Sequence, residues 1–295
     1  MSIAKKELWL APLRGVTIRA FRSVFADAIR EAGFCGVFAP FIPANAGFKS
    51  SRKIFADILP EGAPDGQMLV PQLIGKDPAA LREWCKAVKD LGYRRADLNA
   101  GCPFPMIRKK GRGSGLMRLP DVLDRMLEAG CDEMGAGNFS LKTRLGVESS
   151  DEILSLMPIV NRYPLAVLTV HARTATQMYE GSADLAAFGK VLAAAEVPVM
   201  FNGDATVEDD RGVPLMVGRS FICALADRPG AKELFARYLQ ASREELSGDA
   251  QVLGRMKELL SYWCTRPSWR RLWQLVKICR TTQELSMVVG KRICS

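Results

Sequence analysis

The sequence predicts an α/β fold, namely a TIM (β/α)8 barrel followed by a small C-terminal all-helical domain. Eight short apolar runs recur over roughly the first 240 residues, and amphipathic helical patterns lie between most of them. Beyond residue 230 the pattern becomes helical throughout. Strands that alternate with helices in this number are typical of a closed parallel barrel.

The predicted strands are short apolar runs, each followed by a turn or by a helical pattern. They are LWLAPL (8–13), GVFAPF (36–41), MLVPQLI (68–74), RADLNAG (95–101), NFSLKTR (138–144), LAVLTVHAR (165–173), PVMFNGD (198–204) and PLMVGRSF (214–221). An open doubly wound sheet is the alternative arrangement. Eight strands followed by a change in composition favour the barrel.

The clearest predicted helices are Pro78–Leu91, Pro120–Ala129 and Asp184–Ala194, and the first two begin with a proline in the first turn. One connection is too short for the pattern, because only nine residues separate Asp204 from Pro214. A parallel crossover normally needs about a dozen residues or more. The helix after the seventh strand is therefore either one turn long or missing.

The predicted domains are residues 1–241 for the barrel and residues 242–295 for the helical domain. The second contains LGRMKELLSYW and SWRRLWQLVKICR, its best helical segments. One face of the latter segment carries Trp269, Leu272, Trp273 and Val276. We expect these aromatic side chains to pack in a small bundle rather than to stack on nucleic-acid bases.

Composition narrows the class of protein. No apolar run reaches 18 residues, and the N-terminus lacks the apolar core of a signal peptide, so we expect a cytoplasmic protein without a membrane span. The eight cysteines are scattered without a CxxC pair, so we expect no bound metal and mostly buried thiols. The net charge of +9 weakly favours a polyanionic partner, and residues 242–295 hold ten Lys and Arg against five Asp and Glu.

Polar or special residues end nearly every predicted strand. They are Pro12, Gln72, Asn99 with Cys102, Lys142 with Arg144, His171 with Arg173, Asn202 with Asp204, and Gly218 with Arg219. In a barrel these ends form one face, which carries the active site. Burying an unpaired charge costs roughly several kcal/mol. We therefore expect Lys142 and His171 to serve a site rather than the packing of the core.

These residue types predict a phosphate site and a site for a planar heterocycle. Gly218 and Arg219 end a late strand, where backbone N–H groups commonly bind phosphate. Gln72 and Asn99 offer paired donors and acceptors for the edge of a heterocycle. No strand leads into a G-x-G-x-x-G motif, so we expect no nicotinamide dinucleotide held by a Rossmann unit. The tract KKGRGSGLM (109–117) is interpreted as a flexible basic loop near the mouth.

Several motifs together resemble those of the tRNA-dihydrouridine synthases. The matches are APLRGVT, VPQLIG, DLNAGCPFP, KKGRGSGLM, LKTRLG, VHARTATQMYEGSAD, NGD and MVGR, in family order from about residue 10 to 220. The motifs D-x-N-x-G-C-P and H-x-R-T-x-x-Q-x-Y-x-G are specific in combination. The basic helical tail also has the family's position and character.

The resemblance implies FMN in the mouth of the barrel. Carried over by position, the FMN contacts are Pro12, Leu13, Arg14, Gln72, Lys142, His171, Asn202, Gly203, Asp204, Gly218 and Arg219. Lys142 would lie beside the isoalloxazine ring, while His171 and Arg219 would help to hold the phosphate. Arg14 stands where the family usually has a smaller residue. The short connection after the seventh strand lies beside the phosphate-binding strands.

For the substrate, the resemblance places Asn99, Arg144 and Arg173 at the uracil and assigns tRNA phosphates to Lys109, Lys110 and the basic tail. Reduction of the uracil 5,6 double bond needs a hydride at C6 and a proton at C5. The hydride comes from reduced FMN, with NADPH or NADH as reductant. A thiol with a pKa near 8.5 is protonated at neutral pH, so Cys102 on its Gly-Cys-Pro turn is the predicted acid.

Three functions remain open from the sequence. The first is flavin-dependent reduction of a uridine to 5,6-dihydrouridine in tRNA or another structured RNA. The second is an FMN oxidoreductase of a free pyrimidine, similar to dihydroorotate dehydrogenase. The third is a catalytically decayed RNA-binding homologue. The sequence favours the first and a monomer, and it leaves open which uridine is reduced and which nicotinamide is preferred.

Overall fold

The fold is a closed parallel barrel, as the sequence predicts. The computed structural model describes residues 6–60 and 68–290. The strands are β1 (Leu8–Leu10), β2 (Phe34–Phe38), β3 (Ile42–Pro43), β4 (Met68–Val70), β5 (Gln72–Ile74), β6 (Ala96–Ala100), β7 (Phe139–Gly146), β8 (Leu168–Thr174), β9 (Val199–Asn202) and β10 (Leu215–Val217). Each of the eight predicted runs contains a strand.

The sheet closes on itself through an interrupted strand. Its order is β3-β5-β6-β7-β8-β9-β10-β1-β2-β4, and neighbouring strands pair in parallel. One end of this order, β4, and the strand next to its other end, β5, are separated in the chain by Pro71 alone. Pro71 lacks an N–H group for the ladder, although its carbonyl still accepts from the Asp97 N–H. Together β4 and β5 form the third strand of an eight-stranded ring.

Helices flank the strands, and the three clearest predictions are confirmed as α3, α5 and α7. No helix separates β9 from β10, so the helix expected to be short or missing is missing. The helices up to residue 227 are α1 (Arg19–Val24), α2 (Ala26–Glu31), η1 (Ala56–Ile58), α3 (Pro78–Asp90), α4 (Pro105–Arg108), η3 (Gly113–Arg118), α5 (Pro120–Met134), η4 (Glu152–Leu156), α6 (Met157–Val160), α7 (Leu185–Ala194), α8 (Arg219–Ala224) and η5 (Leu225–Asp227).

Two hydrophobic cores hold the barrel. The larger one lies between the strands and the surrounding helices. The smaller one fills the inside of the barrel and consists of Trp9, Ala11, Phe38, Val70, Met200 and Met216. Gly36 makes room for the Trp9 ring, because a Cβ atom at Gly36 would lie 2.6 Å from that ring.

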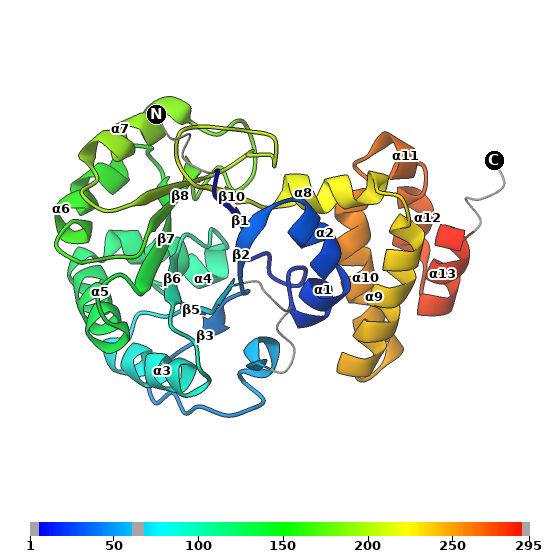
Figure 1. The fold of residues 1–295 in the computed structure, drawn as a ribbon, viewed down its shortest axis with the longest axis horizontal. Helices are drawn as coiled ribbons and strands as arrows, with labels where there is room; N and C mark the ends of the chain where they lie inside the picture. Colours follow the sequence, from blue (N-terminus) through cyan, green and yellow to red (C-terminus); the bar gives the residue numbers. More distant parts are fainter. Residues whose placement is uncertain (1–5, 61–67, 291–295) are drawn as a thin grey trace.

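A helical lobe lies on one side of the barrel, with α1, α2 and α8 between them (Figure 1). Its helices are α9 (Ala231–Glu245), α10 (Asp249–Trp263), α11 (Pro267–Arg270), α12 (Trp273–Ile278) and α13 (Thr282–Gly290). The predicted boundary between residues 241 and 242 falls inside α9. Segment 268–280 is split between two short helices rather than forming one. The final residues of the predicted helical domain, 291–295, lie outside the described residues.

Aromatic side chains join the lobe to the barrel. The Trp263 ring lies 4.9 Å from that of Trp269 and 6.4 Å from that of Phe25, both in edge-to-face geometry. Tyr238 of α9 packs in the same way on Phe21 and Phe25. Trp263 and Trp269 are buried, so these two rings pack in the bundle as expected.

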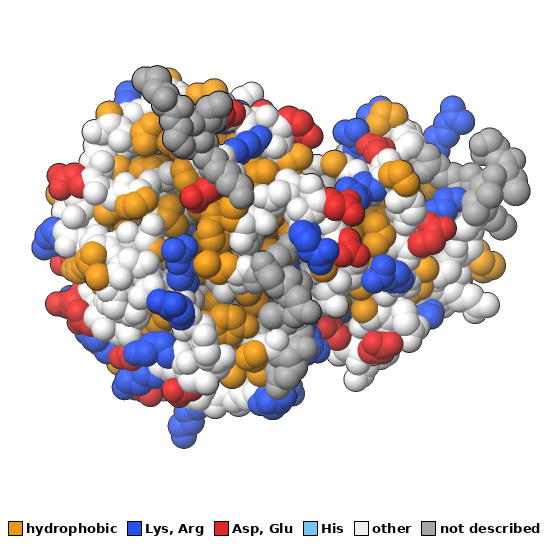
Figure 2. Space-filling view, in the orientation of Figure 1, with side chains coloured by type: hydrophobic (Ala, Val, Ile, Leu, Met, Phe, Trp, Pro, Cys, Tyr) orange, Lys and Arg blue, Asp and Glu red, His pale blue; other side chains and the backbone are white. Residues whose placement is uncertain are grey.

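The described surface is mixed in charge. On the face in Figure 2, Lys and Arg side chains are scattered among acidic ones over the barrel and the helical lobe. Within residues 6–60 and 68–290, no helix has the length and apolar character that a bilayer crossing requires.

Candidate active site

Two adjoining cavities lie at the carboxyl ends of the strands. The smaller has a volume of about 600 Å³ and the larger about 960 Å³. Both volumes suit small-molecule sites, which typically span roughly 300–1,000 Å³. The wall that they share is formed by Pro12, Leu13, Lys142, His171, Tyr179, Arg219 and Tyr262. A ligand in one cavity would therefore border a ligand in the other.

Most residues of the predicted site line one of these cavities. The smaller cavity is lined by Pro12, Leu13, Lys142, His171, Asn202, Gly203, Asp204, Gly218 and Arg219 from the predicted cofactor set, and also by Arg173. The larger is lined by Asn99, Cys102, Lys110, Arg144 and Arg14. Arg14, predicted to contact FMN, thus lines the larger cavity together with the predicted substrate residues, whereas Arg173, predicted to face the uracil, lines the smaller cavity together with most of the predicted FMN contacts. Gln72 and Lys109 line neither cavity.

Strand register brings the polar residues together. Asn99 is paired with Lys142, Arg144 with His171, and His171 with Asn202. Lys142 Nζ donates to Asn202 Oδ1 over 2.9 Å, and Asn202 Nδ2 donates to the Met216 carbonyl over 2.7 Å. Side chains from β7 and β9 are in this way fixed to the backbone of β10.

The smaller cavity is electropositive. Lys142, Arg173 and Arg219 line it, and Asp204 is the only acidic residue among the described residues of its lining. Asp204 Oδ2 accepts from Arg173 Nη2 over 2.5 Å, and its Oδ1 lies 3.6 Å from Arg219 Nη2. The remaining excess of positive charge, together with planar guanidinium donors, suits a phosphate group.

Arg173 is held rigidly in this cavity. Its guanidinium donates to the carbonyls of Glu180 and Gly181 as well as to Asp204. Arg173 Nη1 also lies 3.3 Å from His171 Nε2. Because a guanidinium can only donate, this contact requires a neutral His171 that accepts at Nε2.

The charge state of His171 follows from its surroundings. Burial lowers the pKa of His171 well below its ordinary value, and the nearby charges of Arg144, Lys142, Arg173 and Arg219 lower it further. Burial also lowers the pKa of Lys142 to about 8, with a further decrease from Arg144 and an opposing increase from Asp97. At neutral pH the cavity therefore contains a neutral imidazole and a protonated Lys142.

Cys102 lies on a tightly held turn after β6. Its N–H donates to Asn99 Oδ1 over 2.9 Å, and its carbonyl accepts from the N–H and the hydroxyl of Ser114 over 3.0 and 2.9 Å. Gly113 packs on this turn with a φ of +55°, and a Cβ atom there would lie 2.7 Å from Cys102 Cβ. The tract at 109–117 is thus not wholly a flexible loop, because Gly113–Met117 is buried in η3.

The surroundings of Cys102 keep its thiol protonated. Burial raises the pKa of Cys102, while a hydrogen bond from the Phe104 backbone and the charges of Arg144, Arg14 and Lys142 lower it by less. The residue is buried, yet it lines the larger cavity. A protonated thiol on a fixed turn can serve as a general acid toward a ligand in that cavity.

Two tyrosines that the sequence left without a role also form the site. The Arg219 guanidinium lies 4.6 Å from the Tyr179 ring centre and that of Arg144 lies 5.4 Å from it. Tyr179 belongs to the H-x-R-T-x-x-Q-x-Y-x-G motif, which could have indicated it. Tyr262 comes from α10 of the helical lobe, and no local pattern marks it. Among the described residues, no group of His, Cys, Asp and Glu is arranged to hold a metal ion.

Solved structures resemble this chain in fold. A structure of morphinone reductase superposes with a TM-score of 0.52 at 10% identity, covering 73% of this chain and 82% of that one. The old yellow enzyme from Trypanosoma cruzi gives a TM-score of 0.52 at 12% identity, with 77% and 88% covered. At such low identity these similarities support the TIM-barrel fold alone.

The chain also has relatives in sequence. tRNA-dihydrouridine synthase B of Vibrio cholerae is 30% identical over 201 residues, which cover 68% of this chain and 60% of that protein. A probable tRNA-dihydrouridine synthase of Rhodobacter capsulatus is 31% identical over 223 residues, covering 71% and 66%. The chain thus spans less than two thirds of the length of either relative. Residues 9–211 match the model of the dihydrouridine synthase family, and the chain belongs to that family.

Proposed function

We propose that the protein reduces a uridine in tRNA to 5,6-dihydrouridine, with FMN as cofactor and NADPH or NADH as reductant. The observation that carries the proposal is the placement of Cys102. Its thiol lines the larger cavity, which shares a wall with the electropositive smaller cavity. A substrate in the larger cavity would then lie between an acid and a cofactor site. This arrangement suits the addition of a hydride and a proton across a double bond. The relatives' names support the same reaction.

The smaller cavity fits FMN by its chemistry. Arg219 offers guanidinium donors for the phosphate, Arg173 offers the N–H of Nη1 that is not directed at His171, and neutral His171 offers its other ring nitrogen. Bound there, FMN supplies the hydride that goes to C6 of the uracil. Lys142 Nζ places a positive charge in the wall between the two cavities, where negative charge on the flavin ring would be stabilised. Pro12, Leu13, Asn202, Gly203, Asp204 and Gly218 complete the lining.

Cys102 Sγ would hold the proton that goes to C5 of the uracil. Its raised pKa keeps that proton on the thiol at neutral pH. Asn99 and Arg144 line the same cavity and would orient the base. Arg144 donates to the carbonyls of Gly101 and Thr174, so its guanidinium is held in place beside the turn.

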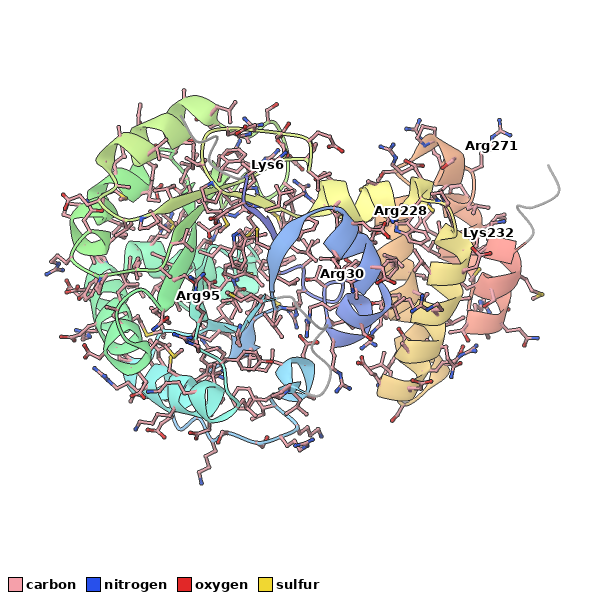
Figure 3. The ribbon with its side chains drawn as sticks, viewed as in Figure 1. Lys6, Arg30, Arg95, Arg228, Lys232 and Arg271 are labelled. Atoms are coloured by element: carbon pink, nitrogen blue, oxygen red, sulfur yellow. The ribbon has the colours of Figure 1, made fainter. Side chains whose placement is uncertain are left out.

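The RNA would bind across the mouth and the helical lobe. Lys110 and Arg14 line the larger cavity, and Lys109 is exposed next to them. Figure 3 shows Arg228, Lys232 and Arg271 on the helical lobe. Contacts of Lys and Arg with phosphates release counterions, so tRNA affinity should fall steeply with salt. Residues 242–295 would act as the tRNA-binding domain and residues 1–241 as the FMN domain.

Mass spectrometry of tRNA tests the reaction. Unmodified tRNA is incubated with the FMN-loaded protein and NADPH, and in parallel with NADH, and then digested and analysed. We expect one uridine to gain the mass of two hydrogen atoms. Cys102→Ala should abolish the gain, whereas Cys35→Ala, which removes an exposed thiol of β2, should retain it.

Parallel assays of free-pyrimidine reduction, tRNA binding and FMN binding separate the other functions. Reduction of a free pyrimidine without reduction of tRNA would replace the proposal by an oxidoreductase of small molecules. tRNA binding without FMN binding would replace it by an RNA-binding protein. Removal of the helical lobe cannot make this distinction, because Ser261, Tyr262 and Thr265 of the lobe line the smaller cavity.

A further inference from the structure

A buried chain of hydrogen bonds runs beneath the larger cavity. Asp97 Oδ1 accepts from Ser140 Oγ over 2.6 Å, and Asp97 Oδ2 accepts from Gln72 Nε2 over 2.7 Å. Gln72 Oε1 in turn accepts from Asn99 Nδ2 over 2.8 Å. Asp97, Gln72 and Ser140 are buried and belong to β6, β5 and β7.

The chain ends at the turn of Cys102. Asn99 Oδ1 accepts from the Cys102 N–H over 2.9 Å and from the Gly101 N–H over 3.1 Å. Every donor in the series therefore points toward Asp97. Asp97 is not among the residues that line either cavity, so it can act on a ligand only through this series.

The two ends of the chain fix its direction. Burial raises the pKa of Asp97 to about 6, against the lowering effect of the hydrogen bonds from Ser140 and Gln72, so Asp97 is ionised at neutral pH. An ionised carboxylate can only accept, and backbone N–H groups can only donate. The amide groups of Gln72 and Asn99 could each be turned over on their own. Turning Gln72 would bring its oxygen against Asp97, and turning Asn99 would bring its NH₂ group against two backbone N–H groups. One orientation of each amide satisfies every link.

This orientation decides what Asn99 offers to a ligand. Its oxygen is occupied by two backbone donors, and one hydrogen of Nδ2 is occupied by Gln72. The second hydrogen of Nδ2 has no acceptor within the described part of the chain, and Asn99 lines the larger cavity. Asn99 therefore presents a donor and no acceptor.

We propose that Asp97 is a positioning residue that, through Gln72, sets the amide of Asn99 so that it binds a carbonyl oxygen of the base. The site would then accept the carbonyl-bearing edge of uracil and reject a base with an amino group at that place. A buried carboxylate is costly unless it is paired or hydrogen-bonded, and this one has two donors. The identity of the base rests on the proposed function, whereas the direction of the chain does not.

Reversal of the chain tests the proposal. In Asn99→Asp, the new carboxylate still accepts from Gly101 and Cys102, but its second oxygen faces Gln72 Oε1. Gln72 can turn over only by bringing that oxygen against Asp97. We expect the urea midpoint of the apoprotein to fall clearly. Adding Asp97→Asn supplies a donor for the turned Gln72, while the new amide oxygen accepts from Ser140. The midpoint should recover.

A third substitution separates this mechanism from simple repulsion between two carboxylates. Gln72→Met removes the link but leaves the charges at positions 97 and 99. Asp97→Asn should raise the midpoint of Asn99→Asp when Gln72 is present, and should raise it little when Gln72→Met is also present. Equal recovery in both backgrounds, or no loss in Asn99→Asp alone, would overturn the proposal.

A kinetic measurement with tRNA tests whether Asn99 binds the base. The double variant Asn99→Asp with Asp97→Asn regains its stability but carries no amide donor at position 99. Loss of a hydrogen bond to the base should raise the KM for tRNA about tenfold. An unchanged KM would show that Asn99 does not bind the base. The urea results stand on their own if the protein reduces no uridine, so a failure of the proposed function remains distinguishable.

Discussion

At the scale of single residues, the site depends on the close contact between Gly113 and Cys102. The backbone of Cys102 is held on two sides. Its N–H donates to Asn99 Oδ1, and its carbonyl accepts from the Ser114 hydroxyl. Gly113 closes the turn from a third side with a positive φ. The position of the thiol thus depends on a glycine that carries no chemistry.

Gly113→Ala should displace Cys102, because its Cβ would lie 2.7 Å from Cys102 Cβ and 2.8 Å from the Cys102 carbonyl oxygen. Gly47→Ala is the matched control, since Gly47 also has a positive φ but has nothing within 4 Å. Both variants should lose about 1–2 kcal/mol from backbone strain. The first should in addition lose more than tenfold in the rate of uridine reduction. Equal rates in single-turnover assays would show that the turn tolerates displacement.

The charge of Lys142 should set the alkaline limit of FMN binding. Its pKa is lowered to about 8, so Lys142 is cationic below pH 8 and neutral above it. We expect the Kd for FMN to rise as the pH increases through 8. Lys142→Arg keeps the charge in this range, so its Kd should stay level up to pH 9.5. Fluorescence titrations of the two proteins check this, and parallel curves would exclude Lys142 as the cause.

The sequence predicted which residues gather at the mouth but not which cavity each one faces. His171 and Arg173 are two positions apart on β8, and their strand positions predict one common direction. The division into two cavities arises from Tyr179 and from α10, which come from distant parts of the chain. Which cavity Arg173 lines depends on its hydrogen bonds to Glu180, Gly181 and Asp204, and these bonds form only in the folded chain.

At the scale of helices and strands, the buried parallel strands were the easiest to predict. They are continuous apolar runs, so pattern alone marks them. The strand β3 has two residues, and this is too short for any periodicity. The break between α11 and α12 escaped prediction because the helical spacing of Trp269, Leu272, Trp273 and Val276 continues across it. Burial of Trp269 and Val276 satisfies this spacing on two short helices.

The contact between α5 and β7 provides a test of packing at this scale. A Cβ atom on Gly130 of α5 would lie 2.2 Å from the ring of Phe139, which is fully buried. Gly130→Ala should therefore destabilise the protein by about 1–3 kcal/mol through overpacking. Gly189→Ala on α7 has open space around it and should stabilise by about 0.5–1 kcal/mol. Urea unfolding measures both, and changes of the same sign would contradict this account.

At the scale of the whole molecule, the barrel and the helical lobe share one aromatic core. Trp263 contacts Phe25 of the barrel region and Trp269 of the lobe. The neighbouring Tyr262 lines both cavities. The sequence predicted a separate helical domain because the composition changes near residue 242. Composition carries no information on contacts between distant helices, so the shared core became visible only in the fold.

We therefore expect the protein to unfold in one transition, and Trp263→Ala to weaken both parts together. Loss of this buried side chain should cost about 3–5 kcal/mol, whereas Trp273→Ala, at a half-buried position, should cost less than half of that. Circular dichroism of the helices and quenching of bound FMN should report the same urea midpoint. Separate midpoints would show that the two parts fold independently.

The molecule contains a single histidine, and it lies in the wall between the two cavities. In a nuclear magnetic resonance spectrum, any imidazole signal of the untagged chain must therefore come from His171. No assignment is needed to follow it. Its ring should keep the chemical shifts of the neutral form through pH 6.5, and it should respond to ligands that enter either cavity. Because the chain has one histidine, the His171 resonances report on the site without any label.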